Sequence, residues 1–327
     1  MKLEQPCQYL RSMVVYACMR FSVILLLAAF IGCSTPVTTH AWGDHTMRLA
    51  SSLELAGAKL QAQASAPFAP DSAEFLSVSL TGREIENDFA RQVMVWKALD
   101  DYASDIERIL NGRDRKSERV REVARAFHEL HRHLLQSGIA NELGLTVAMH
   151  RATVHKILIS KSMVSALEAA QPAVAVLCTH SAEASKLLEG RLDDWLDTCL
   201  RQIDSKWRTP LDGYALFLAQ KRELEQQIAA QAAGVTKRGG DHAGELLKVE
   251  TLLRNSEKWR KLYVEEQGSI ALAFRDARNH VQKTAHAVLE WAIAHREITK
   301  AMRSDSSFPN MRLLEASAKE LAPAAAE

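Results

Sequence analysis

The sequence predicts an all-α protein, an elongated antiparallel helical bundle with long, coiled-coil-like helices. Apolar residues recur at spacings of three and four over most of residues 83–304, which is the periodicity of an amphipathic helix. No β-rich run bounded by turns is present, and aromatic residues make up only 6% of the chain. Each predicted helix has one apolar face, so we expect the helices to cover one another.

The first element is a predicted signal segment, residues 1–32. From Met19 a cationic residue is followed by about a dozen apolar or small residues, the layout of an export signal and too short to span a bilayer, which needs about 20. Glu4, Pro6 and Arg11 precede this apolar core, which is unusual for a leader. A true start at Met19 would give a cleaner signal.

The apolar run ends on a small residue and a cysteine, Gly32 and Cys33. This pair resembles the signal of bacterial lipoproteins, although Phe30 and Ile31 replace the Leu and small residue that the family favours. The resemblance covers the first tenth of the chain and implies acylation of Cys33, which becomes the mature N-terminus. In that family a serine such as Ser34 accompanies outer-membrane sorting. We therefore expect an envelope protein, lipid-anchored at the outer membrane and facing the periplasm, with membrane lipid as one partner.

Two other readings of the N-terminus stay open. Ordinary cleavage after Ala41 would leave a secreted protein, because Thr39 and Ala41 are small residues at the two key positions. An uncleaved segment would leave the apolar run as the anchor. Labelling with palmitate distinguishes acylation at Cys33 from both alternatives.

Residues 33–82 are predicted to form the lipid anchor, a tether and a linker. A weak amphipathic stretch covers about 45–64, and Pro67 and Pro70 interrupt any helix after it. Leu76–Leu80 alternates between apolar and polar residues without a partner strand, so we expect an extended linker there.

Residues 83–304 are predicted to form the helical bundle, followed by a loose C-terminal tail at 305–327. The predicted helices lie at 85–110, 117–134, 140–208, 212–233 and 243–304. We expect Pro172 to kink the third helix, and Thr209–Gly213 to form a turn that ends it.

Two cysteines, Cys178 and Cys199, lie in the predicted bundle and raise the question of a disulfide. The apolar pattern keeps one helical phase through Gly190, which places the two sulfurs 21 residues apart (199 − 178), or about 31 Å along one helix. A disulfide needs Cα atoms within roughly 7 Å, so we do not favour one. A hairpin at Gly190 is the alternative, and it would bring the two cysteines together.

His128 and His131 are the candidate metal ligands, because residues three apart on a helix can share a metal ion. The segment lacks the His-Glu-x-x-His spacing of zinc proteases, and the alternative is a solvated polar face. From His128 onward no histidine follows a glutamate by three residues, which excludes the di-iron pattern of helical bundles. We predict no cofactor.

The sequence gives no sign of catalysis or of nucleic-acid binding. Serine-nucleophile and phosphate-loop motifs are missing, and a net charge of +1 provides no field for a polyanion. We therefore expect a non-enzymatic, membrane-tethered scaffold or binding protein with a protein or other envelope component as partner. The alternatives are a membrane-active protein resembling helical pore formers, through the apolar patch Ala169–Leu177, and a carrier of a metal or small molecule.

Overall fold

A computed structural model describes residues 40–112, 116–233, 241–304 and 312–321, and in these ranges the chain is helical without any strand. The all-α helical bundle predicted from the sequence is therefore confirmed. The helices are α2 (His40–Ser65), α3 (Ala73–Asn111), α4 (Lys116–Gln136), α5 (Val147–Leu158), α6 (Met163–Ala232), α7 (His242–Arg303) and α8 (Arg312–Leu321).

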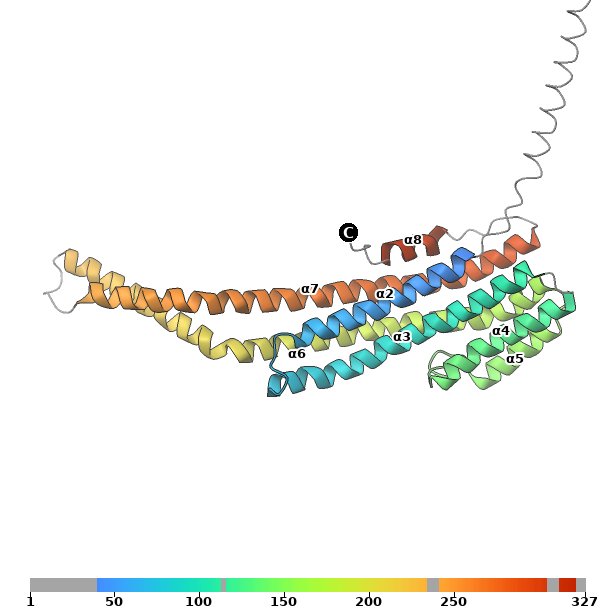
Figure 1. The fold of residues 1–327 in the computed structure, drawn as a ribbon, viewed down its shortest axis with the longest axis horizontal. Helices are drawn as coiled ribbons and strands as arrows, with labels where there is room; N and C mark the ends of the chain where they lie inside the picture. The colour runs from blue at the N-terminus through green and yellow to red at the C-terminus, as the bar shows by residue number, and fades with distance from the viewer. Residues whose placement is uncertain (1–39, 113–115, 234–240, 305–311, 322–327) are drawn as a thin grey trace, which may run out of the picture.

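The longest helices, α6 and α7, lie side by side and run in opposite directions (Figure 1). Arg303 pairs with Glu168 near the start of α6, whereas Lys206 pairs with Glu266 at 2.7 Å farther along both helices. Their shared seam is the backbone of the molecule, on which the shorter helices pack.

Helices α2 and α3 form a second antiparallel pair against this seam. The backbone N–H of Gly43 donates to Glu107 at 3.4 Å at one end, and Lys97 pairs with Glu54 at 3.4 Å farther along. Helices α4 and α5 cover α3 and α6, while α8 lies on α2 and α7. The core contains one tryptophan from each of the four main helices, all at most 1% exposed: Trp42, Trp96, Trp195 and Trp291.

The two ends of α6 and α7 differ in their neighbours. Lys206 donates to the carbonyl of Pro67 in the turn between α2 and α3, and beyond this point the two helices project past the other elements (Figure 1). We call residues 208–232 and 242–265 the arm, and the remaining described residues the body. A helical segment of 25 residues is about 38 Å long, which is the reach of the arm beyond the body.

The prediction of a tether and linker up to residue 82 is wrong for the part that the structure describes. Helix α2 buries Leu49, Leu53 and Leu60, and Leu76–Leu80 belongs to α3. The prolines interrupt the helix only briefly, because the Ser72 side chain accepts from the Phe75 N–H and starts α3. Cys33 and the signal segment lie outside the described residues.

The predicted turn at Thr209–Gly213 is also wrong, since α6 continues through Pro210. Proline removes one backbone hydrogen bond and bends a helix, and α6 changes direction in its yellow stretch in Figure 1. Trp207 and Glu266 tie α6 to α7 next to this point at 2.6 Å. A neighbouring helix therefore carries α6 past a residue that would end an isolated helix.

The predicted single helix at 140–208 is divided by a break at 159–162. Ser162 and Ser165 form a reciprocal capping box that begins α6, while Pro172 lies within its helical span. The capping pair specifies a helix start that apolar periodicity alone does not reveal.

The C-terminal region is not loose where the structure describes it. Helix α8 buries Leu314, Ala318 and Leu321, and it packs against α2 and α7. Residues 305–311 and 322–327 of the predicted tail lie outside the described residues. Among the described residues no helix combines the length and the apolar character that crossing a membrane requires.

Candidate functional site

The predicted histidine pair is part of a three-membered cluster between α4 and α5. His128 Nδ1 lies 3.3 Å from His150 Nε2, and the His131 ring stacks on the His150 ring with centroids 4.1 Å apart. His131 is 4% exposed, so the alternative of a solvated polar face is wrong for this residue. His150 is the member that the spacing within one helix could not predict.

Burial controls the protonation of this cluster. It lowers the pKa of His150 to about 4, with the neighbouring histidines adding to the effect, and it also lowers the pKa of His131. The stacked rings of His131 and His150 are therefore uncharged near neutral pH. Within the described ranges no group of three or more His, Cys, Asp or Glu side chains is arranged to hold a metal ion.

Cys178 and Cys199 lie on one unbroken helix, as the helical phase through Gly190 predicts. Both thiols are free and buried. Burial raises the pKa of each thiol well above its ordinary value, which keeps them protonated and unreactive. They serve as small core residues and form no chemical site.

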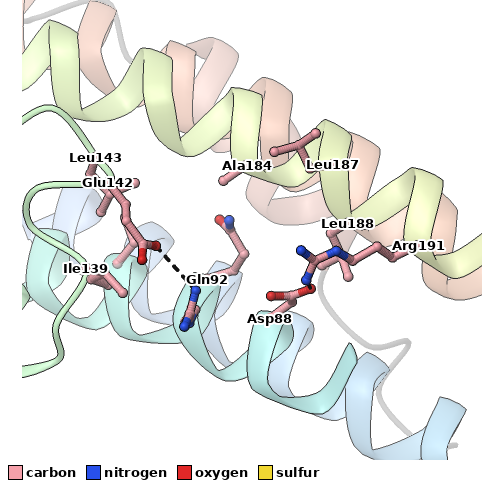
Figure 2. A pocket seen from close by; sticks show the side chains of 11 residues that line it. Asp88, Gln92, Ile139, Glu142, Leu143, Ala184, Leu187, Leu188 and Arg191 are labelled. Carbon is pink, nitrogen blue, oxygen red and sulfur yellow. Dashed lines mark hydrogen bonds and ion pairs between the residues drawn. The ribbon is translucent and has the colours of Figure 1, made fainter. Parts of the chain in front are cut away.

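One concave site is a cavity of about 280 Å³ between α3, α6 and the loop 137–146 that joins α4 to α5 (Figure 2). Its apolar wall comes from Val95 on α3, Ile139 and Leu143 in the loop, and Leu188 on α6. Gly144, at φ +72°, lets the loop turn back toward α6, where an added Cβ would lie 2.7 Å from Val176. The loop backbone therefore closes one side of the cavity.

Two ion pairs flank the cavity. Arg91 on α3 pairs with Glu142 in the loop at 3.3 Å, and Arg191 on α6 pairs with Asp88 on α3. Figure 2 shows Glu142 on one side of the space and the Asp88–Arg191 pair on the other. The lining thus presents two guanidinium groups and two carboxylates, with no net charge.

Gln92 supplies the buried polar group of the cavity. Its side-chain oxygen accepts from the hydroxyl of Ser181 at 3.2 Å and from that of Ser185 at 3.3 Å, which holds the oxygen toward α6. Gln92 is 6% exposed, and its amide nitrogen forms no hydrogen bond within the described residues but is not among the fully buried unpaired atoms, so it keeps some contact with solvent. The wall of the cavity is otherwise largely apolar and therefore contains one amide N–H donor of fixed orientation, that of Gln92.

Sequence reasoning missed this cavity, although one signal for it exists. Gln92 interrupts the apolar face formed by Phe89, Val93 and Trp96 on the predicted helix at 85–110. A polar residue on a core-facing stripe indicates either a buried hydrogen-bond partner or a ligand. Its partners, Ser181 and Ser185, lie about 90 residues away in the sequence and could not be assigned to it without the fold.

The arm carries a different kind of surface, a shallow groove of about 500 Å³ between α6 and α7. Arg254, Lys258 and Lys261 line one side, are exposed, and form no ion pair within the described ranges. Glu257 lies on the same side and pairs with Arg260, while Tyr214, Leu218 and Lys221 line the other side. The lining therefore contains more cations than carboxylates.

Comparison of the chain with protein-family models, curated proteins and solved structures finds no match.

Proposed function

We propose that this protein is a lipid-anchored scaffold of the cell envelope, in which the body stands on the membrane and the arm contacts a partner protein. The observation that carries the proposal is the placement of the two ends. Trp42, near the start of α2, packs on Trp291 of α7 with ring centroids 4.6 Å apart. The tip of the arm lies at the other end of the molecule (Figure 1).

The distance between these ends supports a spacer role. Trp291 is 49 residues along α7 from His242 (291 − 242), which corresponds to a helical rise of about 74 Å. Cys33 precedes His40 by seven residues, so an acyl group on Cys33 can lie at most about 25 Å from the start of α2. An anchor at Cys33 therefore holds one end of the body near the bilayer while the arm extends away from it.

The surface of the arm supports a protein-binding role. Large apolar side chains are 40% exposed or more along it, which is the composition of an incompletely covered helical hairpin. They are Leu216, Leu247, Leu252, Trp259, Leu262 and Val264. The three unpaired cations beside the groove favour a partner with an acidic surface, since opposite charges speed and orient association.

Photo-crosslinking in intact envelopes tests the proposal. A crosslinking amino acid at Leu262 of the arm should give an adduct with a discrete protein, whereas the same group at the exposed Arg121 of α4 should not. The charge reversals Arg254→Glu, Lys258→Glu and Lys261→Glu together should reduce the Leu262 adduct by about tenfold or more. Equal adducts from both positions, or insensitivity to the charge reversal, would reject the role of the arm.

Palmitate labelling tests the anchor separately. The parent protein should incorporate label and the Cys33→Ala variant should not, and fractionation should move that variant out of the membrane. An unlabelled parent protein would reject the anchor without bearing on the arm.

A further inference from the structure

The cavity between α3, α6 and the loop 137–146 is built from features that the scaffold role does not need. Ser181 and Ser185 hold the oxygen of Gln92, which fixes the orientation of its amide group. A ligand that fills the cavity displaces water from this amide N–H, and an N–H left without an acceptor would then cost about 1–3 kcal/mol, so the ligand must itself supply an acceptor.

We propose that this cavity binds a small zwitterion with an apolar side chain, namely a free apolar α-amino acid. Three properties of the cavity lead to this class: its size, its balanced charges and its single fixed donor. The proposal does not depend on the lipid anchor or on the function of the arm.

Size sets the first limit. An apolar cavity of about 150 Å³ accommodates benzene with its six heavy atoms, so 280 Å³ has room for about twice that number. Drug-sized ligands occupy sites of about 300–1,000 Å³, which are larger. Leucine and phenylalanine, with 9 and 12 non-hydrogen atoms, have the appropriate size.

Charge sets the second limit. A purely anionic ligand would meet the carboxylates of Asp88 and Glu142, and a purely cationic ligand would meet the two guanidinium groups. An uncharged hydrocarbon would leave the Gln92 donor without an acceptor. A zwitterion satisfies all of these groups, because its carboxylate can accept from Gln92 and from an arginine while its ammonium group donates to a carboxylate.

The existing ion pairs do not prevent this exchange. Arg91 and Glu142 are 53% and 59% exposed at their side chains, and pairs of this kind contribute only about 0–1 kcal/mol. Their side chains can therefore separate to receive the two charged groups of the ligand. The ligand side chain would then lie against Val95, Leu143 and Leu188, on the apolar wall.

Calorimetric titration of the purified full-length protein with L-leucine and L-phenylalanine tests the proposal. We expect saturable one-site binding, with leucinamide and 4-methylpentanoate binding about tenfold more weakly because each lacks one of the two charges of leucine. Absence of binding by both amino acids up to about 10 mM, or equal binding of 4-methylpentanoate, would overturn the proposal.

Variants locate the binding in the cavity. Gln92→Glu keeps an acceptor for Ser181 and Ser185 but replaces the donor with a second acceptor, so it should weaken binding by about tenfold or more. Ala184→Phe, at a half-buried position in the lining (Figure 2), should abolish binding by filling the space. Thr179→Phe, at an exposed position of the same helix outside the lining, is the matched control and should bind normally.

Circular dichroism distinguishes a lost site from a lost fold. All three variants should retain the helical spectrum of the parent protein. Undiminished binding in a folded Ala184→Phe variant would place the ligand elsewhere and reject the assignment. If Gln92→Glu unfolds, Ala184→Phe alone decides the location.

Discussion

Helices α6 and α7 run through both the body and the arm, yet the two regions are stabilised differently. Along α6, buried residues recur from Met163 to Trp207, and none follows within the described part of that helix. Along α7, Val249 is the one buried residue before Ile270. The amphipathic pattern continues through both regions, so the difference comes from the number of neighbouring helices.

An amphipathic pattern specifies that a segment is helical, but not how many neighbouring helices cover its apolar face. In the body α2, α3 and α8 cover the α6–α7 seam, and burial provides most of the stability of the helices. In the arm each helix has one partner and depends more on its own helix propensity. A partially covered hairpin is suited to a contact surface, whereas a fully covered one is suited to a rigid support.

The largest expected difference between the regions concerns their tryptophans. Trp291 is fully buried, packs on Trp42, and donates to Thr46 at 3.0 Å. Trp291→Ala should lower the free energy of unfolding by about 3–5 kcal/mol, the range for a large buried side chain. Trp259 of the arm is 40% exposed, and Trp259→Ala should cost about 1 kcal/mol or less.

Urea denaturation followed by circular dichroism measures both variants on one scale. The parent protein, titrated alongside, is the reference, and unchanged slopes ensure that the midpoints are comparable. Similar costs for the two substitutions would show that the arm is packed as tightly as the body.

Hydrogen exchange should show the next largest difference. Opening of the arm exposes little apolar surface, so its amides should exchange through local opening about 3 kcal/mol below global unfolding, or roughly 100-fold faster than amides of the body. Mass spectrometry of peptides from residues 208–232, compared with peptides from residues 163–206, measures this ratio. Equal protection would mean that α6 unfolds as a single unit.

The comparison also explains which parts of the fold could be predicted from the sequence. The helical class and the unbroken phase from Cys178 to Cys199 followed from periodicity, which is a local property. Continuation of α6 through Pro210 could not follow, because it depends on α7 lying alongside. Assignment of Leu76–Leu80 to an extended linker failed because a period of two over five residues is too short to outweigh the helical phase of Val78 with Ile85.

The candidate sites were less predictable than the helices. His128 and His131 share a helix and were visible as a pair, but His150 comes from another helix and changes the pair into a buried stack. Gln92 and Ser181 come together only through the packing of α3 on α6. Sites assembled between helices depend on tertiary contacts that a single sequence does not specify.

A smaller effect is expected from pH at the end of the body where α2 begins. Burial raises the pKa of Glu107 to about 7, although the Gly43 N–H partly offsets the effect. The folded protein therefore holds this proton more tightly than the unfolded chain, and stability falls as pH rises from about 4.5 to 7. Glu107→Gln should stabilise the body by about 1–2 kcal/mol at pH 8 and have little effect at pH 5.

The control for this prediction lies in the arm. Arg260 lowers the pKa of the half-buried Glu257, so Glu257→Gln should give no gain at high pH. His295 contributes the opposite slope to Glu107, because burial lowers its pKa to about 4 and stability falls as pH drops from about 6.5 toward 4. Both proteins contain His295, so its contribution cancels when the unfolding free energies of Glu107→Gln and the parent protein are subtracted at each pH. If the unfolding free energies of the two proteins differ by a constant amount from pH 5 to pH 8, the raised pKa of Glu107 is contradicted.

The smallest predicted effects come from glycines, and their sign depends on the space around the added Cβ. A Cβ at Gly213 of the arm would meet no atom within 4 Å, so Gly213→Ala should stabilise the protein by about 0.5–1 kcal/mol through helix propensity alone. A Cβ at Gly82 of the body would lie 2.8 Å from the Trp195 ring and 2.9 Å from Gln61. Gly82→Ala should therefore destabilise, because the ring is held by its bond to the Val78 carbonyl at 3.0 Å.

Thermal or urea unfolding of the two alanine variants provides the measurement, with Gly190→Ala as a third case. Gly190 lies in the body part of α6 but also has open space around its Cβ position, so it should behave like Gly213. The Gly190→Ala variant distinguishes two explanations of the sign. If location in the body decides, the variant should be less stable than the parent protein, and if local space decides, it should be more stable. A lower free energy of unfolding for Gly190→Ala would mean that the exposed helix faces of the body also resist an added methyl group. The body would then differ from the arm in the rigidity of its helices rather than in the area that neighbouring helices cover.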